Sequence, residues 1–470
     1  MVAHPAPARL PRGTWALVAV RFLLYLGMQA AYFIGVIGTL TYRLGADTVY
    51  LSVTVGVLAA AVVAGNAVGG VVSSMRGPRA HTAVTLGCTL AVSLAFQVVE
   101  LDAARVLGLG ALFSFSMGLN YLFLSAYPAY LTADADELKR VNALMSVASY
   151  ASVAAGPALG AAVATALPSE RVFLVAAVLA LAAGAAAVPL MRTCSAVYGT
   201  SGEAGERACA GAAGVRDTGG DTVAAGGDAA GDTVAAGELA GGGTAGGGTD
   251  ANAEPTFADA LRLVMVTPSL ALLFWVGLLS YAGYGAFDPL ESLFYRDVLK
   301  VDIAWMGWLS SAAGVGSVAG SVLALKVPRR HVNVRTLMLL IALEGAACLL
   351  YVGTPHVACA LGGQLLLGVA FGAITPLQST LVQLHTPLGV MGRVNSIMNA
   401  GFNGAGVLPL EAAPAAAAAF GVQGVLVGAS AFVIVVPVAC LALLRRRIAC
   451  IVEDERRGLP SRNKTRQEEL

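Results

Sequence analysis

Polar and aromatic side chains recur along one face of an apolar segment at about residues 267–295. Tyr281, Tyr284, Asp288 and Glu291 are spaced at i, i+3, i+7 and i+10, which places them on one side of a helix. One interpretation is that this stripe faces a polar space between helices, with Asp288 or Glu291 carrying a proton; the family resemblance given below implies that an amphipathic solute passes there. The alternative is hydrogen bonding between helices, with the tyrosines at the membrane interface and Glu291 near the outer surface.

A second stripe lies in the first apolar segment, at about residues 15–42. Tyr25, Gln29 and Tyr32 are spaced at i, i+4 and i+7, again on one helical face. The same two interpretations apply, and we expect these three residues to contact the solute. Arg21, one turn before Tyr25, is expected to extend its charged end toward the inner membrane surface.

Glu344 lies midway through an apolar segment at about residues 334–353. A charge at the centre of a membrane helix costs about 2.5–3.5 kcal/mol, so we expect this carboxyl group to be protonated unless it is paired or faces water. It is a third candidate proton carrier, although a structural role is favoured over that one.

Further polar residues occur in two other apolar segments, at about 105–131 and 356–384. They could complete the lining of the passage or hold neighbouring helices together, and the sequence favours neither. These residues are Ser116, Asn120, Tyr121, Gln364 and Gln378.

The sequence excludes several sources of energy and chemistry. The four lysines are Lys139, Lys300, Lys326 and Lys464, and none follows a glycine, so no phosphate-binding loop of the Gly-Lys-Ser/Thr type is present. The five histidines show no His-Glu-x-x-His zinc motif. We expect no enzyme activity, no cofactor and no metal, which leaves an ion gradient as the energy source.

The composition is that of a membrane protein. Of 470 residues, 57% are hydrophobic and 12% are charged, whereas soluble domains carry about 25% charged residues. The seven cysteines are scattered and odd in number, which is typical of free thiols. A net charge of +1 gives no reason to expect binding to nucleic acid.

Twelve apolar runs are long enough to span a bilayer, six on each side of a linker rich in Gly, Ala, Thr and Asp. We expect the linker to be disordered, because it cannot bury enough apolar surface to offset its ordering entropy. The predicted fold is all-α with twelve transmembrane helices. The predicted parts are an N-terminal six-helix bundle at 1–192, a cytoplasmic linker at 193–255, a C-terminal six-helix bundle at 256–446, and a solvated cytoplasmic tail at 447–470.

Lys and Arg near the ends of the spans predict the orientation. With both termini inside, fifteen of these residues lie on the cytoplasmic side and five on the outer side. We therefore expect a multi-pass protein of the plasma membrane with both termini and the linker in the cytoplasm.

The two halves repeat each other at an offset of about 250 residues. The offset joins four landmarks, which are Pro78-Arg79-Ala80-His81 with Pro328-Arg329-Arg330-His331, Gly65 and Gly69 with Gly316 and Gly320, Arg140-Val141-Asn142 with Arg393-Val394-Asn395, and Tyr25 and Gly27 with Tyr281 and Gly283. Parallel six-helix repeats are the arrangement of transporters in which one half rocks against the other.

At these landmarks the chain resembles the major facilitator superfamily. The loop after the second span fits the family's motif at Gly70, Gly77 and Arg79, but Ser74 stands where the motif has Asp. The loop after the eighth span keeps the basic run with Arg329 and has no acid. The resemblance implies that the first, fourth, seventh and tenth spans line a central cavity, and that these loops take part in gating.

Other expected gating residues lie in the fifth and eleventh spans. Gly156-Pro157 resembles a Gly-Pro motif of proton-coupled exporters. It interrupts the backbone hydrogen bonds and lets a neighbouring helix approach closely, and it serves either as a plain kink or in gating. Arg140 with Asn142, and Arg393 with Asn395, are placed to cap helices and to bind across the halves when the inner side is shut.

The chain is most similar to the macrolide-efflux and enterobactin-exporter branch of that superfamily. The similarity lies in the acidic stretch before Arg140-Val141-Asn142 and in Tyr295-Arg296-Asp297-Val298-Leu299. It implies proton antiport that exports a drug, an antibiotic or a siderophore-like molecule, by a protein that we expect to be a monomer in the bilayer. The alternatives are a sugar or nutrient symporter, and a membrane sensor that has kept the fold without transport.

Overall fold

The computed structural model describes residues 10–125, 127–132, 135–199, 257–328, 331–386 and 391–456. All regular elements in these ranges are helices. The chain divides into two compact units, one of residues 1–39 and 61–225, the other of residues 40–60 and 226–470. Each unit is described by itself.

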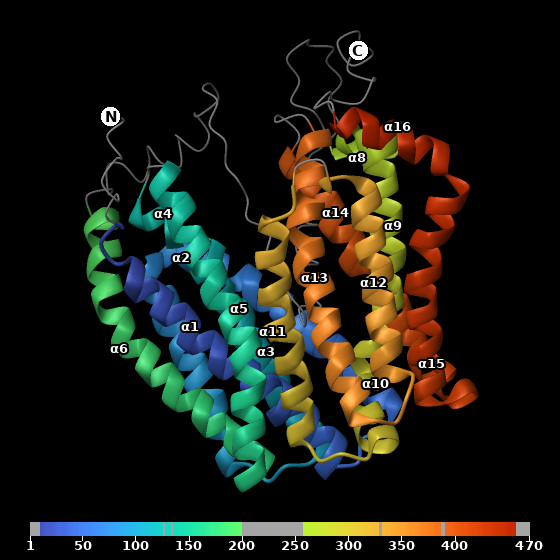
Figure 1. Ribbon diagram of the computed structural model, residues 1–470. Helices are drawn as coiled ribbons and strands as arrows, with labels where there is room; N and C mark the ends of the chain where they lie inside the picture. The colour runs from blue at the N-terminus through green and yellow to red at the C-terminus, as the bar shows by residue number, and fades with distance from the viewer. Residues whose placement is uncertain are drawn as a thin grey trace. The chain divides into compact units, whose positions relative to one another are not determined.

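The first unit is built from the helices that follow one another up to the predicted linker (Figure 1). They are α1 (Thr14–Ala30), the π-helical continuation η1 (Ala31–Arg43), α2 (Thr48–Val98), α3 (Ala103–Ser125), α4 (Tyr127–Leu131), α5 (Ala135–Ala166), the short η2 (Ser169–Arg171) and α6 (Val172–Gly199). The last residues of η1 and the start of α2 belong to the second unit.

The second unit continues with the helices of the C-terminal half (Figure 1). They are α8 (Phe257–Val266), α9 (Pro268–Tyr284), α10 (Phe287–Leu293), the π-helical η3 (Phe294–Leu299), α11 (Ala304–Leu325), α12 (Val334–Val352), α13 (Val357–His385), α14 (Met391–Ala405), α15 (Val407–Leu443) and α16 (Arg445–Arg456).

The chain is an all-α, multi-pass membrane protein. Within the described ranges, eleven helical segments are long and apolar enough to cross a bilayer. The last of them, Ala400–Leu443, covers two of the twelve predicted spans, because α15 leaves helical geometry at Gly421. Gly421 has a φ of 73°, a left-handed conformation that favours glycine, and it lies where the sequence predicts the twelfth span to begin.

Close approach of helix backbones explains why glycines repeat at matching positions in the halves. In the first unit, a Cβ added to Gly65 of α2 would lie 2.0 Å from the carbonyl oxygen of Phe115 in α3. In the second unit, a Cβ added to Gly316 of α11 would lie 2.2 Å from the carbonyl oxygen of Leu365 in α13. Small residues permit such contacts between membrane helices. The glycine landmarks therefore mark the same type of packing in both halves.

Two predicted boundaries differ from the structure. Helix α6 continues to Gly199, beyond the predicted end of the first bundle at residue 192, and the remaining linker residues lie outside the described ranges. The tail was predicted to be a membrane-flanking basic run followed by solvated charge; Arg445–Arg447 and Glu453 are exposed, but the prediction is wrong for the side chains of α16 that pack inward. There α16 packs Ile448 and Val452 into the core of the second unit, together with Ala260 and Val264 of α8. Figure 1 shows α8 and α16 at the same end of this unit.

A buried polar contact also holds α16. The Glu455 Oε1 atom lies 3.0 Å from Nε2 of His385 at the end of α13, and both side chains are almost completely buried. The other oxygen of Glu455 accepts a hydrogen bond of 3.2 Å from the backbone N–H of Val334 in the first turn of α12. The sequence placed Glu455 among solvated charges, because its partners are far away in the chain.

Candidate functional site

Glu291 is the centre of a polar cluster inside the second unit. Its Oε1 atom accepts hydrogen bonds from the hydroxyl of Tyr295 at 2.8 Å, the hydroxyl of Tyr351 at 2.8 Å and the side-chain amide of Gln364 at 2.9 Å. The same amide nitrogen also lies 3.2 Å from the Tyr295 hydroxyl. Three side-chain donors therefore converge on one carboxylate oxygen.

Four elements supply this cluster. Glu291 lies in α10, Tyr295 follows one turn later in η3, Tyr351 is in the last turn of α12, and Gln364 is in the first half of α13. Tyr295, Tyr351 and Gln364 are all buried. Glu291 itself is half-buried, so its carboxylate has partners within the unit, whereas its predicted place near the outer surface stays a prediction.

A close contact between helix backbones lies just before the acids in the seventh span. Helix α9 ends at Tyr284 and α10 begins at Phe287, while Gly285 and Ala286 between them keep right-handed helical dihedral angles. A Cβ added to Gly285 would lie 2.2 Å from the carbonyl oxygen of Gly406, between α14 and α15. Gly285 therefore allows the seventh span to approach the chain at Gly406 closely.

Asp288 lies in the first turn of α10, three residues before Glu291. Residues three apart are neighbours on a helix surface, so the two acids share one face of this segment. Asp288 is half-buried.

Glu344 belongs to a neighbouring cluster between α9 and α12. It is 5% exposed, and its polar neighbour is the hydroxyl of Tyr284. The same hydroxyl lies 3.2 Å from Sγ of Cys348, one turn along α12 from Glu344. Within the described residues, neither Glu344 nor Asp288 nor Glu291 forms an ion pair with Lys or Arg. The three candidate acids thus lie in one unit without a basic partner.

The first unit holds a buried cation, Arg21, where the sequence predicted a side chain that reaches the membrane surface. Arg21 is 4% exposed, and its guanidinium carbon lies 4.1 Å from the centre of the Tyr25 ring. Its Nε donates to Oγ of Ser149 at 3.1 Å, and Nη1 donates to the carbonyl oxygen of Asn120 at 3.3 Å. The expectation that Arg21 extends toward the membrane surface is therefore wrong. The available signal was its position one turn before Tyr25, on the same face as the predicted stripe.

The stripe on α1 is only partly available for contact. Tyr25 and Gln29 are buried, and Tyr32 is half-buried with its ring edge against Phe33. A Cβ added to Gly156 of α5 would lie 2.6 Å from Cβ of Gln29 and 3.0 Å from the carbonyl oxygen of Leu26. Gly156 therefore allows α5 to approach α1 closely, as predicted, and Pro157 stays within the helix; whether the pair is a plain kink or a gating element stays a prediction.

The polar residues of α3 differ from one another. Ser116 is buried and hydrogen-bonds with Thr89 of α2, as a residue that joins helices does. The side-chain amide of buried Asn120 donates to Sδ of Met28 at 3.4 Å. Tyr121 is 39% exposed.

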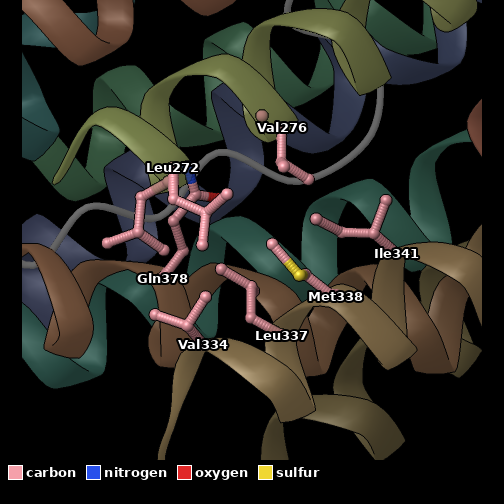
Figure 2. A pocket seen from close by; sticks show the side chains of 9 residues that line it. Leu272, Val276, Val334, Leu337, Met338, Ile341 and Gln378 are labelled. Atoms are coloured by element: carbon pink, nitrogen blue, oxygen red, sulfur yellow. The ribbon is translucent and has the colours of Figure 1, made fainter. Parts of the chain in front are cut away.

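Gln378 and Tyr281 lie beside apolar surfaces of the second unit. Gln378 of α13 lines a pocket whose other walls are apolar side chains of α9 and α12, including Leu272, Val276 and Met338 (Figure 2). The ring of Tyr281 stacks on Phe402 of α14, with centroids 5.2 Å apart and an interplanar angle of 8°. Tyr281 is half-buried in this contact.

The predicted gating residues are described to different extents. Gly77 has a φ of 79° at the turn within α2. Asn142 is half-buried, and the exposed gating residues are Gly70, Arg79 and Arg140. Ser74, Arg393 and Asn395 lie in helices, but their side chains fall outside the description, and Arg329 lies outside the described residues altogether. Their gating role stays a prediction.

Comparison with known proteins identifies the type of chain. A sequence model described as Major Facilitator Superfamily matches residues 17–410 and 273–467. No curated protein matches the sequence.

Solved transporters share the fold at low sequence identity. The nucleoside transporter NupG is 12% identical, with 92% of this chain and 99% of that chain covered and a TM-score of 0.58. A peptide transporter POT in complex with sulfate is 13% identical, with 93% and 95% covered and a TM-score of 0.60. A POT family transporter in complex with 5-aminolevulinic acid is 11% identical, with 93% and 96% covered and a TM-score of 0.61.

Proposed function

The chain belongs to the major facilitator superfamily, and we propose that it exports amphipathic small molecules by alternating access in exchange for protons. The superfamily match and the fold make it a membrane transporter and not an enzyme. The direction of transport, the coupling ion and the class of solute are the proposed parts.

The observation that carries the proton coupling is the group of three acids in the second unit. Ionisable residues inside a membrane are costly, and where they occur they often belong to ion or proton pathways. Asp288 and Glu291 lie about one turn apart in α10, and Glu344 lies beside Tyr284 at the end of α9. Protonation and deprotonation of such a group is a direct way to couple a pH gradient to a change in helix packing.

The proposed solute is amphipathic and weakly charged. Tyr25, Tyr32, Tyr281 and Tyr284 combine large apolar rings with a polar tip, and Gln29 adds an amide on the stripe of α1. This set favours a drug, an antibiotic or a siderophore-like molecule over a phosphorylated one. It agrees with the similarity of the Tyr295–Leu299 sequence to the macrolide-efflux and enterobactin-exporter branch.

The proposed setting is the plasma membrane, with both termini in the cytoplasm and the protein acting as a monomer. The excess of Lys and Arg at one set of span ends supports this orientation. Its partners are then the solute, the proton and the lipid bilayer. Neither a cofactor nor nucleic acid takes part.

Uptake of a nutrient is the second candidate, since the solved transporters with this fold include proteins named for nucleosides and peptides. A sensor without transport is the third, supported by the absence of the motif acid at Ser74. A sensor would bind the solute without moving it. A symporter would accumulate the solute on the side toward which the protons flow.

Reconstitution into proteoliposomes with an imposed pH gradient separates these functions. A fluorescent efflux substrate should move against the proton flow, and Asp288→Asn should abolish that movement. Asp102→Asn is a matched control, because Asp102 is an exposed acid paired with Arg105 at the surface of the first unit. Flux that does not depend on the gradient would rule out antiport, and binding without flux would support the sensor.

A further inference from the structure

His81 is completely buried in the first unit, four residues after the turn of α2 at Gly77. Its Nε2 atom lies 3.0 Å from the carbonyl oxygen of Leu119 in α3, and its Nδ1 atom lies 2.9 Å from the hydroxyl of Tyr127 in α4. The Tyr127 hydroxyl is in turn 2.9 Å from the carbonyl oxygen of Pro78. The imidazole is therefore connected to the turn itself through one tyrosine hydroxyl.

The number of available hydrogens determines which of these contacts can be hydrogen bonds. Leu119 offers only a carbonyl oxygen, so Nε2 of His81 carries a hydrogen in both charge states. In the neutral ring Nδ1 is an acceptor, and the single hydrogen of the Tyr127 hydroxyl must point to it. The Tyr127 and Pro78 oxygens, 2.9 Å apart, then have no hydrogen between them.

A protonated ring reverses the direction of these bonds. Nδ1 then donates to the Tyr127 oxygen, which frees the Tyr127 hydrogen for the Pro78 carbonyl. Thr82 does not replace it, because its one hydrogen is shared between Pro78 at 2.8 Å and Tyr127 at 2.9 Å in either state. The contact between Tyr127 and Pro78 is thus the one that depends on the charge of His81.

We propose that His81 is a second proton-binding site of this transporter, and that its proton ties α4 to the turn of α2 through Tyr127. With the proton bound, Tyr127 donates to Pro78 and holds the turn. Without it, two oxygen lone pairs face each other, and the Tyr127–Pro78 contact opens.

The surroundings of His81 contain no competing charge among the described residues. On its own helix it meets Thr82 and Thr85, while Arg76 and Arg79 are exposed. From α3 it meets the Leu119 carbonyl and the ring of Phe123, at 5.3 Å between centroids. From α4 it meets Tyr127, and the next titratable group there is Tyr130, whose hydroxyl lies 3.4 Å from Ser73. Burial and these hydrogen bonds therefore determine how His81 binds a proton.

The turn that His81 would control has a special backbone. Gly77 has a φ of 79°, which only glycine adopts without strain, and Pro78 fixes the next φ. A hydrogen bond to the Pro78 carbonyl would affect the geometry of the turn between the second and third spans. The equivalent histidine of the second half, His331, is exposed, so the device belongs to the first unit alone.

Nitrogen NMR of the full-length protein in nanodiscs, labelled at histidine, tests the proposal without solute or gradient. The His81 signal is identified by its loss in His81→Gln. We expect Nδ1 to be the unprotonated nitrogen at high pH and to gain a proton as the pH is lowered across the range in which the protein stays folded. An Nδ1 signal that does not change across this range would overturn the proposal.

Hydrogen exchange of the backbone amides near the turn tests the mechanical part. After correction for the intrinsic pH dependence, amides of residues 77–82 should exchange roughly two- to tenfold more slowly once His81 is protonated. Tyr127→Phe should keep the titration of His81 and lose this protection, whereas His331→Gln should keep both. Equal protection in Tyr127→Phe and the wild type would refute the link to Pro78. Because no transport is measured, a failure here is separate from a failure of the antiport proposal.

Discussion

Removing the Tyr351 hydroxyl tests whether the Glu291 cluster is a real stabilising element of the second unit. Tyr351→Phe deletes one of the three donors on Glu291 Oε1 and keeps the buried ring. The Tyr295 hydroxyl and the Gln364 amide remain on the same oxygen, at 2.8 and 2.9 Å. The substitution therefore weakens the environment of the acid without leaving it unpaired.

The size of the effect follows from the type of bond. A hydrogen bond to a charged group contributes about 1.5–3 kcal/mol to stability. Hydrogen bonds between membrane helices contribute about 0.6 kcal/mol on average and at most about 1.7. The 2.8 Å bond between α12 and α10 combines both properties, so we expect a loss of about 1.5 kcal/mol. For a unit of this size that loss lowers Tm by roughly 3–6 °C.

The assay is thermal unfolding in nanodiscs, followed by loss of binding or by tryptophan fluorescence. Tyr42→Phe is the matched control, because Tyr42 belongs to the same unit and its buried hydroxyl has no hydrogen-bond partner among the described residues. This control should change the free energy of unfolding by less than about 0.5 kcal/mol, the usual size for a surface substitution. Its Tm should therefore stay close to that of the wild type. Equal Tm values for Tyr351→Phe and Tyr42→Phe would refute the stabilising role of the cluster.

Three further substitutions test other parts of the structure. Gly156→Ala places a Cβ 2.6 Å from Cβ of Gln29 and should destabilise the first unit by about 1–3 kcal/mol. Gly70→Ala is the control, because a Cβ added there meets no atom within 4 Å, and thermal unfolding measures both variants. Arg21→Leu removes the bonds to Ser149 and the Asn120 carbonyl and should lower Tm, whereas Arg192→Leu, an exposed arginine, should leave it unchanged. Glu455→Gln weakens the contact with His385 and should make α16 more sensitive to limited proteolysis than Glu453→Gln, and equal cleavage of the two would contradict the role of that contact.

The fold could be predicted because its signals are local. Apolar runs, the linker composition and the repeated glycines each depend on residues close together in the chain. The close contact at Gly285 was less accessible, because it depends on Gly406, more than a hundred residues later. The helical pattern through residues 281–291 placed Asp288 and Glu291 on one face but could not show the partners of Glu291.

The site was predicted in part for the same reason. The periodic stripe led to Tyr284, Asp288 and Glu291, but Tyr295 and Tyr351, two of the donors on Glu291, were not among the candidates. Tyr351 comes from a helix 60 residues away in the sequence. The environment of Arg21 was predicted wrongly and no role was predicted for His81, because a single polar residue in an apolar run has no periodicity that indicates its partners. Their partners Ser149 and Tyr127 are brought to them only by the packing of α1, α3, α4 and α5.

The most direct test of the central claim compares two modes of transport in the same vesicles. Exchange of labelled for unlabelled solute across the membrane needs alternating access but no proton movement, whereas accumulation driven by a pH gradient needs both. Because Glu291 and Asp288 interact within one cluster, we predict that Glu291→Gln keeps exchange and loses the response to the gradient. A Glu291→Gln protein that accumulates solute under the gradient as the wild type does would show that this cluster does not carry the coupling.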